Sequence, residues 1–155
     1  MPANTLSADG SVVRRSLAMP ALMKWTRNGM KGAYMKKILV ADDDKTIAEL
    51  LQQALEAEGY ETYKATQSLR FYDAVMERQP DLILLDLMMP YLGGDDELQL
   101  LQMNDATKNI PVIVVTAKQE AKQEAERYRK LGVVEIVTKP FDLDALVAII
   151  KRTIG

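Results

Sequence analysis

The chain contains neither cysteine nor histidine among its 155 residues. Without cysteine it can form no disulfide bond and no thiolate metal site. Without histidine it can carry out neither Ser-His-Asp nor Cys-His catalysis, and it lacks the ligand that many transition-metal sites use. Carboxylates, hydroxyls and lysines are the groups that remain for chemistry. Carboxylates favour hard cations such as Mg²⁺.

Long apolar runs are absent as well. No run approaches the roughly 18 residues that a membrane span requires, and the N-terminus lacks the compact apolar segment of a secretory signal. The chain is 48% hydrophobic and 27% charged, a mixture typical of a soluble globular domain. We therefore expect a cytoplasmic protein that does not associate with a membrane.

The charge is unevenly distributed along the chain. The formal net charge of −2 argues against a domain that binds nucleic acid directly. Residues 1–34 carry five basic residues and one acidic residue, whereas the rest of the chain carries 15 basic and 21 acidic residues. We predict a basic N-terminal extension over residues 1–35, flexible or accessory, followed by one domain over residues 36–155.

Short apolar runs alternate with segments of helical periodicity after residue 35. Helical spacing is seen after Asp44 as far as Gly59 and after Asp142, with each aspartate as N-cap. The apolar face of the helix after Asp44 is expected to include Leu50, and that of a helix over residues 68–78 is expected to include Leu69. The predicted strands are residues 37–41, 60–64, 82–86, 110–117 and 133–137, and the three remaining helices are residues 68–78, 95–105 and 118–130.

The alternation of these elements predicts an α/β fold. Five βα units connected by right-handed crossovers give a parallel sheet with helices on both faces. We expect the flavodoxin-like (βα)5 arrangement, with five strands in the order 2-1-3-4-5. A strand such as residues 82–85 is apolar throughout because both faces of such a sheet are covered.

Polar residues follow the carboxyl ends of four predicted strands, where ligands bind in open parallel sheets. Asp42 and Asp43 end the first strand and Asp86 the third; Thr116 ends the fourth and Lys139 the fifth. Each residue alone has an ordinary structural explanation, such as a cap or a solvated lysine. Together they favour phosphoryl chemistry, in which a divalent cation and a lysine hold phosphoryl oxygens while a carboxylate attacks phosphorus.

Four motifs carry a resemblance to a known family. They are "ILVADDD" (38–44), "DLILLDLMMP" (81–90), "VIVVTA" (112–117) and "VTKPF" (137–141). At this spacing the chain resembles the response-regulator receiver domain over about residues 36–155. The resemblance implies that Asp86 is the phosphoacceptor and that Asp42 and Asp43 hold Mg²⁺ or Mn²⁺ together with Asp86. It also implies that Met88 ligates through its backbone carbonyl.

The resemblance further implies a switch. Thr116 would be the hydroxyl that moves toward the phosphoryl group, and Lys139 the ion-pairing lysine, with a cis bond to Pro140. The second switch position is usually aromatic in the family, but here it is Ile136. Coupling between Thr116 and a ring at position 136 is therefore in doubt, and an aliphatic side chain could repack with a smaller surface change.

The expected partners follow from the same resemblance. The phosphoryl donor would be a histidine kinase or a histidine phosphotransfer protein, and the output would be a downstream protein target or onward transfer of the phosphoryl group. A homodimer through helix 118–130, strand 133–137 and the last helix is a further expectation. We expect no enzyme activity beyond self-phosphorylation and slow self-dephosphorylation. Dephosphorylation is expected to be slow because Met88 offers no hydrogen bond to a hydrolytic water.

Two other classes of function remain open. The segment "DDDKT" (42–46) also fits the nucleophile motif of haloacid-dehalogenase-like phosphatases, with Asp42 as nucleophile and Asp44 as acid/base. In that family, however, the acidic pair comes last. A receiver-like module that interacts without being phosphorylated is also compatible with Ile136. A dinucleotide enzyme is disfavoured, since no G-x-G-x-x-G follows the first strand.

Overall fold

The computed structural model describes residues 34–91 and 93–155, of which residues Lys36–Gly155 form one compact unit. The predicted extension over residues 1–35 lies almost wholly outside the described residues, so that part of the domain assignment stays a prediction. Within residues 34–91 and 93–155, no helix has both the length and the hydropathy of a membrane span.

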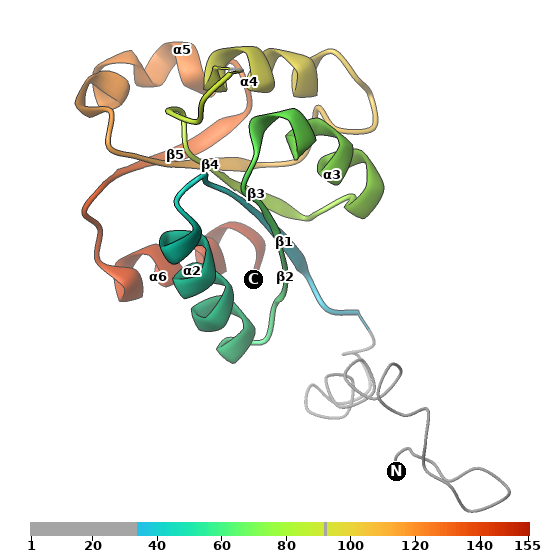
Figure 1. Cartoon of the computed structure of the whole chain (residues 1–155), viewed down its shortest axis with the longest axis vertical. Coiled ribbons are helices and arrows are strands. Elements are labelled where there is room, and N and C mark those ends of the chain that lie inside the picture. The colour runs from blue at the N-terminus through green and yellow to red at the C-terminus, as the bar shows by residue number, and fades with distance from the viewer. Residues whose placement is uncertain (1–33, 92) are drawn as a thin grey trace, which may run out of the picture. The chain divides into compact units, whose positions relative to one another are not determined.

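A parallel sheet forms the centre of the unit (Figure 1). The strand order is β2-β1-β3-β4-β5, as predicted from the alternation of elements. Register links Ile38 with Leu82 and Ala41 with Leu85, so β1 and β3 end side by side. The strands are β1 (Lys37–Ala41), β2 (Glu61–Ala65), β3 (Leu82–Leu85), β4 (Val112–Thr116) and β5 (Val133–Thr138).

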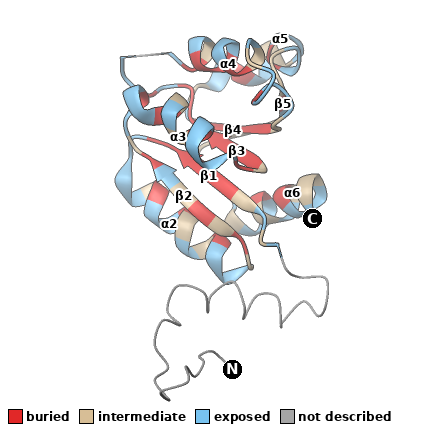
Figure 2. Cartoon of the chain, turned by 90° about the vertical axis from the view of Figure 1, so that its right-hand side faces the viewer, coloured by how far each residue is buried: buried red, intermediate tan, exposed pale blue. Residues whose placement is uncertain are grey.

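Helices cover both faces of the sheet (Figures 1 and 2). One apolar cluster packs α2 and α6 against the sheet, and a second packs α3, α4 and α5 against the other face. The three central strands β1, β3 and β4 are almost wholly buried, whereas the edge strands and the outer helix faces carry exposed residues (Figure 2). The helices are α2 (Lys45–Ala57), α3 (Phe71–Arg78), α4 (Gly94–Gln102), α5 (Ala125–Arg129) and α6 (Leu143–Ile154), with 3-10 turns η2 (Ser68–Arg70) and η3 (Gln119–Glu124).

Two aspartates begin their helices as predicted. The Asp44 carboxylate accepts hydrogen bonds from the backbone N–H groups of Thr46 and Ile47 at the start of α2. Asp142 accepts the equivalent pair at the start of α6. Each cap satisfies two backbone donors that have no partner within the helix.

The prediction of one continuous helix over residues 118–130 is wrong for its first half, which is not α-helical. It consists of the 3-10 turn η3 followed by the short helix α5. Its residues favour an α-helix by propensity, but Ala121 and Tyr128 are fully buried and fix the segment at two points. A 3-10 turn rises about 2.0 Å per residue against about 1.5 Å in an α-helix, so it extends the chain between such points.

Two predicted core positions are also wrong. Leu69 is 74% exposed, because the segment begins as the turn η2 and thereby turns Phe71 toward the core instead. Leu50 is exposed as well, because the buried face of α2 is formed by Ala48, Leu51 and Leu55. In both segments the predicted apolar face therefore contains one residue that lies outside the buried face.

Glu97 is a buried acid in the first part of α4. The residue is fully buried, and neither carboxylate oxygen has a hydrogen-bond partner. Burial, and to a lesser extent the charge of Asp96, raises the pKa of Glu97 to about 8. The neutral form is therefore favoured in the folded state, and deprotonation at higher pH leaves an unpaired buried charge.

We predict that Glu97→Met stabilises the protein increasingly as pH rises. A folded-state pKa above the unfolded value means that the wild type loses stability between pH about 4.5 and about 8. At pH 7 the gain should reach roughly 3 kcal/mol, and urea unfolding over pH 4–8 measures it. The same substitution at exposed Glu77 is the control. A gain that does not vary with pH would contradict the prediction.

Candidate functional site

The carboxyl ends of the strands bring the predicted site residues to one edge of the sheet. Asp42 and Asp43 directly follow β1, and Asp86 directly follows β3. Thr116 is the last residue of β4, and Lys139 follows β5. Since β1, β3, β4 and β5 are successive neighbours and all parallel, these residues meet although up to 97 positions separate them.

Lys139 joins the two buried carboxylates. Its Nζ donates to Asp42 Oδ2 at 2.6 Å and to Asp86 Oδ2 at 2.9 Å. Asp42 is 3% exposed and Asp86 is 6% exposed, so water contributes little to their stabilisation. The peptide bond between Lys139 and Pro140 is cis, as predicted. The Lys139 N–H also donates to the Thr116 carbonyl at 2.8 Å, which ties the end of β5 to the end of β4.

Backbone donors hold the second oxygen of each buried carboxylate. The Asp44 N–H donates to Asp42 Oδ1 at 2.9 Å, and the Met88 N–H donates to Asp86 Oδ1 at 3.0 Å. Each donor lies two residues after its acceptor, in the loop that follows the strand. Both carboxylates are therefore fixed on one side by their own loop and on the other by Lys139.

Gly94 lets α4 begin close to the loop that carries Asp86. A Cβ built on Gly94 would lie 2.7 Å from the Leu87 Cα, which no side chain can occupy without moving that backbone. A Cβ built in the same way on Gly93 would meet its nearest atom, Asp96 Oδ2, at an ordinary contact distance of 3.9 Å. The glycine at position 94 thus supports the placement of Asp86, whereas that at position 93 is not required for space.

Three carboxylates form a cluster suited to a hard cation. One oxygen each from Asp42, Asp43 and Asp86 lies within 4.8 Å of the others. Asp43 is exposed, unlike its two partners. With Lys139 as the neighbouring cation, the group keeps two negative charges in excess, which a divalent cation would balance. The donor set is all oxygen, as Mg²⁺ prefers, so the residues fit such an ion.

Burial and the ion pairs act in opposite directions on the pKa values of Asp42 and Lys139. Burial raises the pKa of Asp42, and the hydrogen bonds from Lys139 and Asp44 only partly oppose this rise. Burial by itself lowers the pKa of Lys139, but its hydrogen bonds and charge interactions with Asp42 and Asp86 outweigh burial and raise it. The lysine therefore stays charged, and the carboxylates are under-compensated.

Thr116 lies at the same edge but points into the protein. It is fully buried, and its Oγ1 accepts a hydrogen bond from the Lys118 N–H at 3.2 Å. The hydroxyl is thus held by the loop that follows β4. Its movement toward Asp86 stays a prediction.

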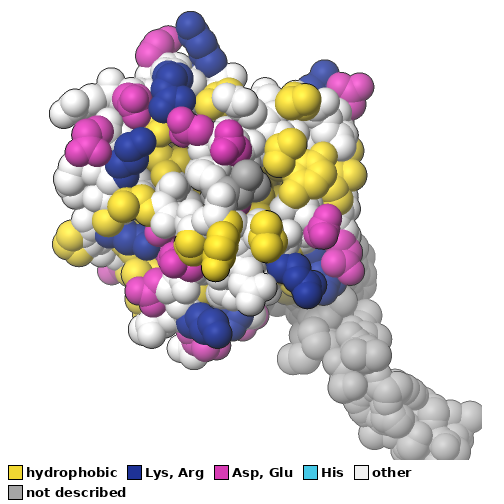
Figure 3. Space-filling view, turned by 45° about the horizontal axis from the view of Figure 1, so that its top comes forward, with side chains coloured by type: hydrophobic (Ala, Val, Ile, Leu, Met, Phe, Trp, Pro, Cys, Tyr) yellow, Lys and Arg dark blue, Asp and Glu magenta, His cyan; other side chains and the backbone are white. Residues whose placement is uncertain are grey.

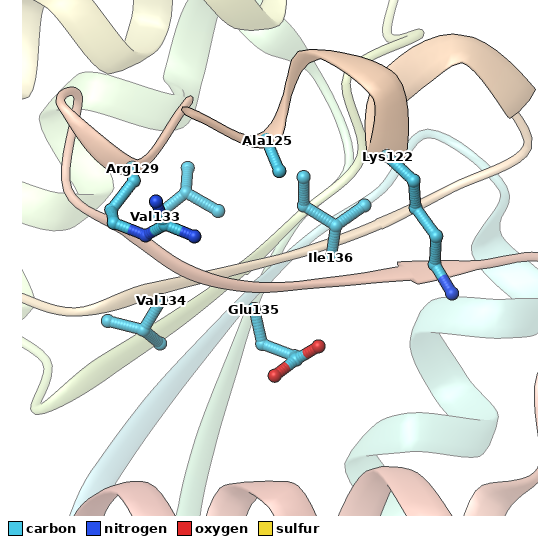
Figure 4. Close-up of a pocket in the computed structure, with 7 residues that line it drawn as sticks. All are labelled: Lys122, Ala125, Arg129, Val133, Val134, Glu135 and Ile136. Atoms are coloured by element: carbon cyan, nitrogen blue, oxygen red, sulfur yellow. The ribbon is translucent and has the colours of Figure 1, made fainter. Parts of the chain in front are cut away.

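Met88 and Ile136 have contrasting surroundings. Met88 is 58% exposed while its N–H contacts Asp86; the role predicted for its carbonyl stays a prediction. Ile136 is almost buried and points toward α5 in Figure 4, whereas Glu135 points to the other side of β5. A pocket of about 290 Å³ lies here, lined by Lys122, Ala125, Arg129, Val133, Val134, Glu135 and Ile136.

Sequence reasoning missed one residue beside the site. Tyr128 is fully buried, and its hydroxyl accepts hydrogen bonds from Lys118 and Arg127. The available signal was a single aromatic residue within a segment that is otherwise polar.

Comparison with known families decides what kind of domain this is. The model of the response regulator receiver domain matches residues 38–151, which is most of the chain. The chain belongs to the response regulator receiver domain family. The receiver domain accounts for the strand order and for the acidic cluster at the edge of the sheet. The boundary near residue 35 is not tested by this match.

Individual relatives agree with this assignment. The phosphate regulon transcriptional regulatory protein PhoB of Pseudomonas aeruginosa is 36% identical over 119 residues, which cover 77% of this chain and 52% of that protein. Sporulation initiation phosphotransferase F of Bacillus subtilis is 36% identical over 117 residues, covering 76% of this chain and 92% of that one. This chain therefore spans about half the length of the first relative and nearly all of the second.

A solved structure shows the same fold with ligands. The response regulator TrrA of Thermotoga maritima, in complex with Mg(2+)-BeF, has a TM-score of 0.68 and is 29% identical. The alignment covers 77% of this chain and all of that one.

We predict that Lys139→Met strongly destabilises the metal-free protein. It leaves Asp42 and Asp86 without their counter-ion, and removing one partner of a buried ion pair costs about 3–5 kcal/mol. Lys64→Met is the matched control, because Lys64 pairs with Glu49 at 3.2 Å on the surface and should cost at most about 1 kcal/mol. Urea unfolding without divalent cations measures both. Equal losses would contradict the prediction.

Proposed function

We propose that this receiver domain accepts a phosphoryl group on Asp86 from a phosphohistidine of a histidine kinase or histidine phosphotransfer protein. A carboxylate oxygen of Asp86 attacks phosphorus, the phosphorus–nitrogen bond breaks, and the imidazole leaves with the bonding electron pair. The product is an acyl phosphate. The observation that carries this proposal is the Lys139 bridge, which joins Asp86 to Asp42 and so places the candidate nucleophile within the acidic cluster.

Each residue of the edge has a role in this reaction. Asp42, Asp43 and Asp86, with the Met88 carbonyl, would hold Mg²⁺ or Mn²⁺, which supplies charge neutralisation to the transferred phosphoryl oxygens. Lys139 offers an ammonium to the same oxygens once it releases a carboxylate. The loop N–H groups keep the Asp86 side chain oriented. The TrrA structure, solved in complex with Mg(2+)-BeF, supports a divalent cation as part of this proposal.

Phosphorylation of Asp86 would change the structure around β4 and β5. A phosphoryl group adds about 1.5 to 2 negative charges beside Lys139. Thr116 supplies the side-chain hydroxyl of β4, and its rotation toward Asp86 would disturb the Lys118 loop and Ile136. The result is a shift between two populations of the surface around α5 and β5.

That surface offers a site for output. The pocket is lined by four apolar and three charged side chains, which come from η3, α5 and β5. We propose that a downstream protein or a second copy of the chain binds at the face formed by α5, β5 and α6. On the face drawn in Figure 3, basic and acidic side chains alternate, which supports protein contacts over direct nucleic-acid binding.

The alternative phosphatase reading is not favoured. The Asp44 carboxylate caps α2 by accepting from the Thr46 and Ile47 N–H groups, so it is engaged in the helix start and not placed as an acid/base group. We propose no enzyme activity beyond self-phosphorylation and slow self-dephosphorylation. A cytoplasmic location is part of the same proposal.

Acetyl phosphate with Mg²⁺ should add one phosphoryl group to the wild type, as measured by intact-protein mass spectrometry. Asp86→Asn should take up none, because an amide is not a nucleophile of this kind. Asp44→Asn is the matched control: asparagine also caps a helix, so labelling should persist. Equal labelling of wild type and Asp86→Asn, or loss of labelling in Asp44→Asn, would reject the assignment.

The phosphoryl group should persist for minutes or longer at neutral pH with Mg²⁺. Met88 cannot hydrogen-bond a water that approaches Asp86, so the water is not oriented for attack. Decay of the labelled mass after removal of acetyl phosphate measures the lifetime, and Met88→Asn should shorten it. Complete decay of the wild type within seconds would show the idea to be wrong.

A further inference from the structure

Tyr128 is a polar aromatic residue in the core beneath α5. Its side chain heads the fully buried side chains of the described residues by volume. It belongs to the same apolar cluster as Leu87 and Met89, in the loop after Asp86, and as Ile136 on β5. The ring therefore forms part of the packing between the phosphorylatable loop and the surface pocket.

Two cations converge on the Tyr128 hydroxyl. Lys118 Nζ donates to it at 3.4 Å and Arg127 Nη2 donates at 3.3 Å. The Arg127 guanidinium also lies over the Tyr128 ring, with 4.6 Å between its central carbon and the ring centroid. Both distances lie at the long end of the range for N–H···O hydrogen bonds, and both donors carry a positive charge.

Arg127 and Lys118 connect the Tyr128 hydroxyl to α4 and to Thr116, respectively. Arg127 pairs with Asp95 in the first turn of α4 at 3.0 Å, and α5 lies beside α4 in Figure 1. Lys118 extends in the other direction, since its backbone N–H holds Thr116 Oγ1 at 3.2 Å. A continuous path thus leads from α4 through Arg127, the Tyr128 hydroxyl and Lys118 to the Thr116 side chain.

We propose that Tyr128 is a positioning residue whose hydroxyl, through Lys118, holds the Thr116 hydroxyl on the loop after β4 in the resting state. Removing the hydroxyl loosens the loop after β4 and lets Thr116 turn more readily. The consequence for Thr116 rests on the proposed function, whereas the tie between Tyr128 and Lys118 does not. Ile136 carries no polar group, so the aromatic hydroxyl in this part of the core comes from α5 instead of β5.

The tie is tested without metal or phosphoryl donor. Tyr128→Phe keeps the ring and removes only the oxygen. Amide hydrogen exchange of Lys118, followed by NMR, should become about three- to tenfold faster, as expected for the loss of one hydrogen bond of ordinary strength. Tyr72→Phe is the matched control, because the Tyr72 hydroxyl bonds Asn104 between α3 and the chain after α4. Unchanged exchange in Tyr128→Phe, or equal acceleration by the control, overturns the proposal.

A double-mutant cycle tests whether the two side chains act together. Lys118→Met removes the other partner and should accelerate the same amide. Combining it with Tyr128→Phe should add almost nothing, because the shared bond is already lost. Full additivity of the two effects also overturns the proposal. Because Lys118→Met reports on the same tie, poor folding of Tyr128→Phe would still leave a decisive measurement.

A titration with beryllium fluoride and Mg²⁺, which together imitate a bound phosphoryl group, separates this inference from the proposed function. Amide shifts of β5 and α5 should respond in the wild type, and Tyr128→Phe should reach half-response at a severalfold lower concentration. No response in the wild type rejects the proposed function while leaving the exchange result valid. A wild-type response that Tyr128→Phe leaves unshifted rejects the role of Tyr128 in holding Thr116.

Discussion

The ammonium of Lys139, held between Asp42 and Asp86, is the interaction on which the rest of the site depends. Burial raises the pKa of Asp42, and the hydrogen bond and charge of Lys139 oppose that rise. The parallel sheet creates this problem, since its faces are covered by helices and polar groups can lie only at its edge. The lysine compensates one charge of the cluster, and the excess that remains suits a divalent cation.

Support for the site is divided unevenly. On the side of β1 and β3, loop N–H groups fix both carboxylates, and Gly94 allows α4 to pack directly on Leu87. After β4, the chain continues as a 3-10 turn and a helix of only five residues. Short segments with 3-10 hydrogen bonding reorganise at lower cost than long helices do. Asp86, the proposed phosphoacceptor, is thus held by fixed donors, whereas the segment after β4 is the one that can reorganise more easily.

Glu97 and Tyr128 both place polar atoms in the apolar core on the α3–α4–α5 side. Glu97 has no hydrogen-bond partner and is more stable uncharged, whereas the Tyr128 hydroxyl is bonded by two cations. They illustrate opposite outcomes of placing a polar atom in low dielectric: an unpaired group costs stability, and a paired group fixes a structure. Only the paired one connects to residues of the site.

The sequence by itself determined the order of elements, the strand order, both aspartate caps and the set Asp42, Asp86, Thr116 and Lys139, because strand and helix periodicities are local and parallel strands end at a common edge. Tertiary structure decided what local pattern could not express. It made residues 119–129 a 3-10 turn and a short helix, exposed Leu50 and Leu69, and buried Glu97 and Tyr128. Propensity and periodicity describe a segment alone, whereas burial and hydrogen-bond partners depend on residues distant in the chain, and those contacts become known only when the chain is folded.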